Sequence, residues 1–82
     1  MNRVSLTKLA AVNKDTNMLE EGYNLKGFLI SPIAVGNIIR VMRYERNDLK
    51  IDGVFTSSYV TKIEGNKIHT NNSIWEIEYL PD

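Results

Sequence analysis

The segment from Val54 to Tyr79 constrains the fold more than any other part of this chain, because it is a nearly unbroken run of residues that favour β-strands. One tight turn, Glu64-Gly65-Asn66-Lys67, divides the run. Gly and Asn tolerate the positive φ angles of two-residue hairpin loops, so this turn predicts a β-hairpin. The stretch Ser73–Tyr79 adds a further strand. We therefore predict a fold that is mostly β.

The length and the absence of cysteine limit how the fold can be stabilised. The chain has 82 residues, which suits one small domain over residues 1–82 with a single core. No disulfide can form, which points to a reducing, intracellular setting or to indifference to redox state.

Neither a targeting segment nor a membrane span is predicted. The start of the chain lacks the basic segment followed by an apolar block that marks a secretory signal. The most apolar stretch, residues 27–39, is interrupted by Pro32 and Gly36 and falls well short of the ~20 apolar residues that a membrane helix needs. We expect a cytoplasmic protein without a membrane partner.

The first half of the chain predicts two strands and a loop. Over residues 3–12, Val4 and Leu6 alternate as in a strand, whereas Leu6 and Leu9 also have helical spacing. A strand and a short helix both remain open, and the strand is favoured because so short a helix would be marginal. Residues 13–24 are predicted to be a loop, and a second strand over residues 25–31 ends at Pro32.

Residues 38–46 form the longest predicted strand, and its two faces differ. Ile39 and Val41 share one phase, which we assign to the core. The opposite, outward phase contains Arg40, Met42, Tyr44 and Arg46. A polar loop is then expected from Asn47 to Gly53.

The C-terminal strands predict both a bend and a core. Phe55 and Ile63 share a parity that Val60 does not, so the strand must bulge near residues 57–59 if all three are buried. Trp75 and Ile77 are predicted to be buried. Their expected neighbours are Ile39, Val41, Phe55 and Ile68.

Five or six short antiparallel strands in 82 residues suit a small, partly open all-β barrel. The spacing of Val35-Gly36, Ile39, Val41 and Arg43, followed by Phe55-Thr56-Ser57 and by Thr70–Ile77, resembles small uncharacterised proteins of phages and other mobile elements in bacteria, whose barrels are of the Src-homology-3 type. The sequence departs from that pattern at Ser58, where proline is common, and at Trp75, where tyrosine is. The resemblance implies a fold and a biological context, but no shared activity.

Catalytic and cofactor motifs are missing from the sequence. His69 is the only histidine, and without cysteine a zinc site would need carboxylates or a second chain. Glu76 and Glu78 are predicted to lie on a solvent face, and the serines have no histidine at a suggestive spacing. The polar corners at residues 56–58 and 70–73 are expected to bond nearby backbone, with a polar binding ledge as the alternative if both corners meet. We predict a protein that is not an enzyme and holds no cofactor or metal.

The residues that carry our binding hypothesis lie on the strand over residues 38–46. They are Arg40, Met42, Arg43, Tyr44 and Arg46. Arg, Tyr and Met are enriched in protein interfaces, so the leading hypothesis is a protein-binding accessory module of a mobile element, acting as an adaptor or inhibitor of a host factor. The alternative is a nucleic-acid-binding barrel that uses Arg40, Tyr44 and Arg46 to contact phosphates and stack a base. Burial of Met42 and Tyr44 under a loop, and a homo-oligomer, both remain open.

Overall fold

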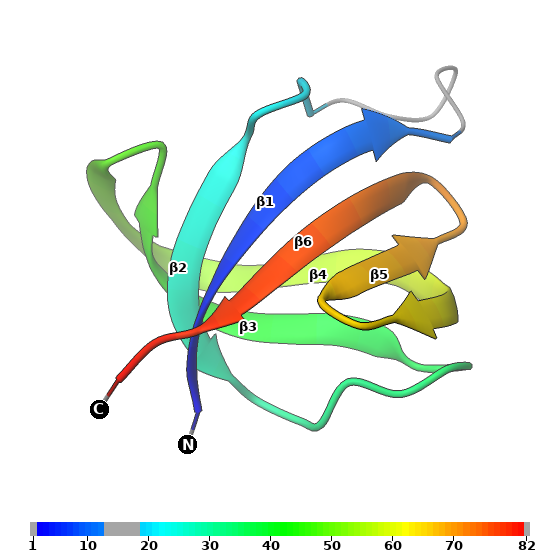
Figure 1. Ribbon diagram of the computed structural model, residues 1–82. Helices are drawn as coiled ribbons and strands as arrows, with labels where there is room; N and C mark the ends of the chain where they lie inside the picture. Colours follow the sequence, from blue (N-terminus) through cyan, green and yellow to red (C-terminus); the bar gives the residue numbers. More distant parts are fainter. Residues whose placement is uncertain (1, 13–18, 82) are drawn as a thin grey trace.

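The computed structural model describes residues 2–12 and 19–81, which form an all-β barrel of six antiparallel strands (Figure 1). The strands are β1 (Arg3–Ala11), β2 (Asn24–Leu29), β3 (Ile38–Arg46), β4 (Leu49–Glu64), β5 (Lys67–Thr70) and β6 (Ser73–Tyr79). Each strand pairs with the next, and β1 pairs with β6 to close the ring. The predicted fold class and the strand over residues 3–12 are confirmed. The predicted loop over residues 13–24 is confirmed for residues 19–23 and wrong at Asn24, which pairs with Thr7 as the first residue of β2. Residues 13–18 lie outside the described residues.

A tight turn lies at each end of β4. Asn47 and Asp48 both have positive φ angles, 48° and 67°, as a type I′ hairpin turn requires. Because this turn is only two residues long, β4 begins at Leu49, and the loop predicted up to Gly53 is wrong. At the β4–β5 turn, Gly65 has a φ of 59° and Asn66 has no positive φ, which is the pattern of a type II′ turn. The predicted hairpin there is confirmed.

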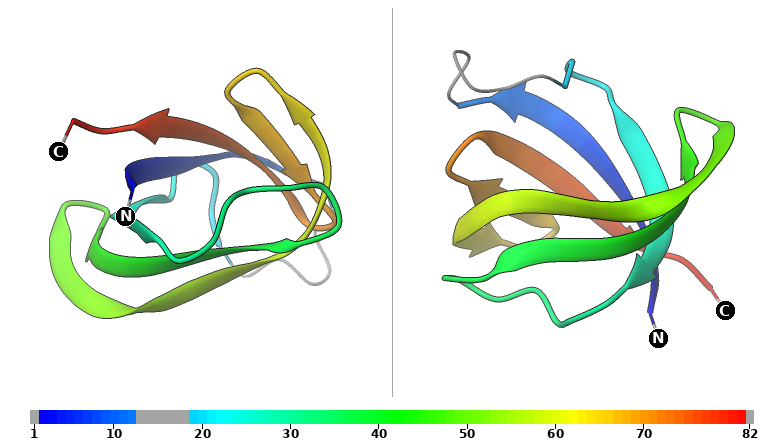
Figure 2. Two further views of the ribbon diagram at one scale, coloured as in Figure 1. Left: turned by 90° about the horizontal axis from the view of Figure 1, so that it is seen from below. Right: turned by 180° about the vertical axis from the view of Figure 1, so that it is seen from behind.

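Strand β4 is long enough to belong to both halves of the barrel, and a bulge lets it bend between them (Figure 2). Ile38 pairs with Tyr59 while Arg40 pairs with Thr56, so β4 has one extra residue over this interval. The bulge turns both Phe55 and Val60 into the core, as predicted. Ile63, which shares the parity of Phe55, is exposed near the end of the strand.

The core lies inside the ring and centres on Trp75. The Trp75 ring packs edge-on against Phe55, with ring centroids 5.3 Å apart, and against Tyr23 at 6.3 Å. The predicted burial of Trp75 and Ile77 is confirmed. The buried apolar side chains are Val4, Leu6, Tyr23, Leu25, Leu29, Ile39, Val41, Phe55, Val60, Ile68, Trp75 and Ile77.

A lysine of β1, Lys8, is buried in the core, which the sequence did not predict. Lys8 follows Val4 and Leu6 at two-residue spacing, pairs with Trp75 and is only 1% exposed. Its ammonium donates to the carbonyl oxygen of Leu19 at the end of the barrel. Burial lowers the pKa of Lys8 below its usual 10.5, and Glu21 partly offsets this by favouring the charged form.

Candidate functional site

An exposed apolar row crosses the outer surface of three neighbouring strands. Phe28 of β2 lies opposite Met42 of β3, and Met42 lies opposite Val54 of β4. Directly opposed residues of antiparallel strands project from the same face, so the three side chains form one continuous row. They are 38%, 46% and 50% exposed, respectively. We call Phe28, Met42 and Val54 the apolar row, and the outer surface of β2, β3 and β4 the β2–β3–β4 face.

Two further side chains widen the apolar row. The Tyr44 ring lies 5.7 Å from the Phe28 ring at an interplanar angle of 48°. Ile30 is also exposed, and its N–H donates to the Arg40 carbonyl at 2.9 Å, which places it beside β3. Contiguous exposed apolar patches on small soluble proteins commonly mark contact sites.

Gly27 allows the paired strands β2 and β3 to lie very close together beneath this face. A Cβ at this position would lie 2.6 Å from Val41 Cγ1 and 2.9 Å from Arg43 Cα, and still closer to the Met42 carbonyl oxygen. No side chain fits there. The glycine therefore allows the approach that aligns Phe28 with Met42.

Three of the five predicted binding residues contribute to the β2–β3–β4 face. Arg40 is exposed and lies opposite Thr56, Met42 is in the apolar row, and Tyr44 is half-buried against Phe28. Among residues 2–12 and 19–81, no ion pair includes Arg40. Its side chain is accessible from outside the barrel.

The other two predicted residues, Arg43 and Arg46, are in the inward phase. Relative to β2, β3 has one extra residue between Arg43 and Glu45, and this bulge reverses the alternation. Arg46 consequently lies opposite Leu25, whose side chain is in the core, so the prediction that Arg46 shares the phase of Arg40 is wrong. Arg43 lies opposite Gly27 and donates from Nη1 to the Tyr23 hydroxyl at 3.1 Å.

Charged residues border the apolar row beyond Tyr44. Lys26 lies opposite Glu45, and their charged groups are 3.0 Å apart. Asp48 is 4.0 Å from the same ammonium. The hydrogen bond to Glu45 and the nearby negative charges raise the pKa of Lys26. The face thus has an ion-pair cluster on one side of the row and Arg40 on the other.

The two polar corners meet, and they bond backbone as predicted. Ser57 Oγ accepts from the Ile39 N–H at 2.9 Å, and Ser58 Oγ accepts from the Asn72 N–H at 3.1 Å. Thr70 Oγ1 donates to the Ser73 carbonyl at 3.0 Å and accepts from its N–H at 3.1 Å. These hydroxyls satisfy backbone groups of the bends, which supports a structural role.

His69 contacts the Glu64 carboxylate at the surface. Its Nε2 is 3.1 Å from Glu64 Oε1, and Lys62 Nζ is 3.4 Å from the other oxygen of the same carboxylate. Lys62 and His69 lower the pKa of Glu64. In the part of the chain that the structure describes, no three His, Cys, Asp or Glu side chains cluster so as to hold a metal ion.

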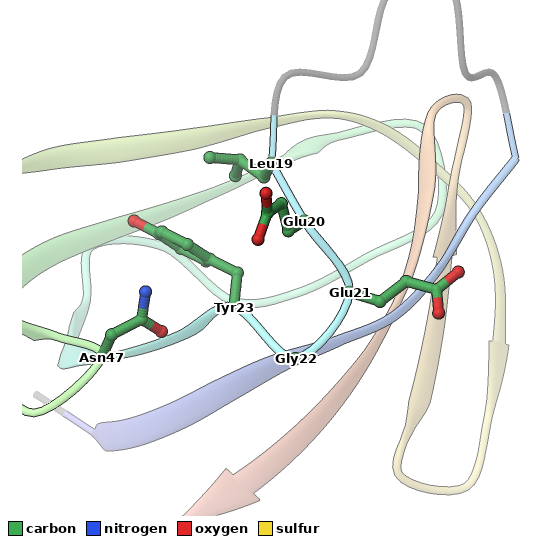
Figure 3. A pocket seen from close by; sticks show the side chains of 6 residues that line it. All are labelled: Leu19, Glu20, Glu21, Gly22, Tyr23 and Asn47. Carbon is green, nitrogen blue, oxygen red and sulfur yellow. The ribbon is translucent and has the colours of Figure 1, made fainter.

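A pocket of about 430 Å³ lies at the end of the barrel near the start of β2 (Figure 3). Its lining residues are Leu19, Glu20, Glu21, Gly22, Tyr23 and Asn47. Glu20 lies on the Tyr23 side of the pocket, whereas Glu21 points away from Tyr23 and Asn47. Paired acid–base catalysis requires two carboxylates that converge on one point. The Glu20 and Glu21 carboxylates do not converge.

Comparison with protein-family models, with curated proteins and with solved structures finds no match for this chain. Among the described residues, no helix is long and apolar enough to cross a membrane.

Sequence reasoning missed Phe28 and Val54 as site residues. Both are separated from Met42 along the chain, and only the strand register brings them beside it. The available signal was that Phe28 and Val54 have the parity opposite to the core residues Leu29 and Phe55 of their own strands.

Proposed function

We propose that this protein is a non-enzymatic binding module that docks a protein on the β2–β3–β4 face. The observation that carries the proposal is the apolar row, in which Phe28, Met42 and Val54 lie side by side in register and are all substantially exposed. Aromatic side chains, Met and Arg are enriched at protein interfaces, and this face offers each of them. The row supplies no acid, base or nucleophile, so binding is the function that it suits.

The geometry favours a protein over a nucleic acid as the occupant. A single-strand binder needs basic side chains that follow the backbone and free aromatic rings for stacking. Here Arg43 and Arg46 are in the inward phase, and the Tyr44 ring packs against Phe28. The formal net charge is zero, which gives no overall attraction to phosphates.

The resemblance to barrel proteins of phages and mobile elements extends the proposal to a biological setting. In that setting the barrel acts in the cytoplasm as an adaptor or inhibitor of a host or element-encoded protein. Docking through a sheet face requires no pocket, and this fits a small barrel whose core is filled by its own side chains.

Photo-crosslinking in the cells that produce the protein tests the docking face. A photoreactive phenylalanine analogue replaces Val54 in one variant and Val35 in a control variant. Val35 is also exposed, at 60%, but lies in the β2–β3 connection rather than in the apolar row. We expect discrete protein adducts from position 54 and none from position 35. Equal labelling from both positions, or none from position 54, would contradict the proposal.

Titration of a labelled single-stranded oligonucleotide at two salt concentrations tests the nucleic-acid alternative. We expect no measurable binding at about 150 mM salt, where the Debye length is about 8 Å. A salt-sensitive complex that is lost in Arg40→Ala would favour the alternative, because each lost phosphate contact flattens the salt dependence by about 0.7 log units per decade for a single strand.

A further inference from the structure

We propose that the occupant of the β2–β3–β4 face is a second copy of this chain, related by a two-fold axis that runs along the apolar row. The inference rests on the proposed function, because it uses the same face. It names the partner from the symmetry of the row and from the charges on either side of it.

The apolar row is suited to lie on a two-fold axis. Phe28, Met42 and Val54 are direct neighbours across three strands, so the row runs perpendicular to the strand direction. A two-fold axis along the row, in the plane of the interface, keeps each strand over its own copy and reverses its direction. Each apolar side chain then packs against the same side chain of the second copy.

The charges on the two sides of the row are complementary under this operation. Arg40 lies two residues from Met42 on one side of the row, and Lys26, with its partner Glu45, lies two residues from Phe28 on the other side. At about 3.4 Å per residue, Arg40 on one side and the Lys26–Glu45 pair on the other each lie about 7 Å from the axis. The rotation therefore places Arg40 of one copy over Glu45 of the second copy, and the same pair forms a second time across the axis.

Neighbouring residues are compatible with the same arrangement. Thr56 lies opposite Arg40 on β4, so on this strand the rotation brings an uncharged hydroxyl, and no second cation, toward the charged residues on the other side of Val54. The formal net charge of zero gives two copies no overall repulsion. Because the face covers only part of three strands of a small barrel, we expect a weak dimer with a dissociation constant in the micromolar range.

Sedimentation velocity on the full chain, between about 1 µM and about 1 mM, covers concentrations below and above a micromolar dissociation constant. We expect the weight-average sedimentation coefficient to rise with concentration. Met42→Glu should abolish the rise, whereas the matched control Val35→Glu should preserve it. Circular dichroism of each variant shows whether the barrel is intact, and Val54→Asp is the second interface variant if Met42→Glu does not fold.

A pair of charge-reversal variants distinguishes dimerisation about the predicted axis from non-specific association. Arg40→Glu and Glu45→Arg should each be monomeric alone, because each places like charges together twice. Mixed in equal amounts, they should dimerise, because both cross-axis pairs are then opposite in charge. A monomer at all concentrations, a dimer unaffected by Met42→Glu, or a mixture that stays monomeric would overturn the inference.

The outcomes separate this inference from the proposed function. If the chain is monomeric but position 54 crosslinks to a different protein and Met42→Glu abolishes that adduct, the second-copy inference fails and the proposed function stands. If position 54 yields neither kind of adduct, both fail.

Discussion

The two outer faces of this barrel are built differently over the same core. On the β2–β3–β4 face, three directly opposed side chains are apolar and exposed. On the face formed by β5, β6 and β1, turned toward the viewer in Figure 1, the corresponding row is Lys67, Glu76 and Thr7. Lys67 and Glu76 are exposed and opposite in charge. The polar row shows that strands of this barrel pair stably without apolar side chains on the outside.

The contrast indicates that the apolar row is not required by the fold. Side chains on the outer face of a barrel strand alternate with core side chains and are free to be polar. Exposed apolar patches also lower solubility, so they are expected where contact is useful. On this view, the two faces depend on the same core and differ only in the contacts that they offer to a partner.

The largest expected effect comes from breaking the core that both faces share. Trp75 pairs with Lys8 of β1 and Ile68 of β5, and its ring packs against Phe55 of β4. Trp75→Ala should lower the free energy of unfolding by ~3–5 kcal/mol, because a large cavity replaces the indole. Urea unfolding followed by circular dichroism measures the loss. As a control, Ile63→Ala removes an exposed apolar side chain and should change stability by only about 0.5 kcal/mol.

Gly27→Ala should damage one face and spare the other. The added methyl group would collide with the β3 backbone and with Val41, so β2 would have to move away from β3. We expect a loss of about 1–3 kcal/mol, as for overpacked sites. Amide hydrogen exchange should rise in β2 and β3 while β5 and β6 keep their protection. As a control, Lys26→Ala removes a half-buried side chain with its ion pairs to Glu45 and Asp48, and it should cost at most about 1 kcal/mol. Equal effects from the two variants would show that β2 and β3 are not packed tightly at Gly27.

Much of the fold was predictable because it depends on local sequence. The alternation of Ile39 and Val41 with Arg40 and Met42 identified the two faces of β3 correctly as far as Tyr44. The prediction was wrong beyond that point because the bulge between Arg43 and Glu45 depends on pairing with β2, which no pattern within β3 encodes. The site was less predictable than the fold for the same reason, since its members come from three strands.

The burial of Lys8 was not predicted, for a different reason. Its parity matched that of Val4 and Leu6, but a lysine in a core phase is normally read as exposed because burying a charge is costly. In the structure, the long Lys8 side chain extends to the end of the barrel, where its ammonium donates a hydrogen bond to the Leu19 carbonyl oxygen.

Lys8→Met should change how stability depends on pH. The folded pKa of Lys8 is lowered by burial, so between that pKa and 10.5 the unfolded chain holds a proton that the folded chain has released. Stability therefore rises with pH through this window, and the full cost of burying the charge is present below it. We expect the wild-type protein to gain stability relative to Lys8→Met as the pH rises toward 10.5. Parallel pH profiles for the two proteins would show that Lys8 keeps an ordinary pKa.

The smallest effect on stability, and the sharpest test of the comparison, comes from placing a charged side chain in the apolar row and an apolar side chain in the polar row. Met42→Glu and Glu76→Met each replace an exposed side chain, so each should shift the free energy of unfolding by only about 0.5 kcal/mol. Retention on a hydrophobic resin should respond unequally. Met42→Glu divides the apolar row and should elute much earlier than wild type, whereas Glu76→Met adds one methionine among polar neighbours and should elute only slightly later. If Met42→Glu instead lost as much stability as Trp75→Ala, Met42 would belong to the structural core. The apolar row would then be part of the packing, and the difference between the two faces would carry no information about binding.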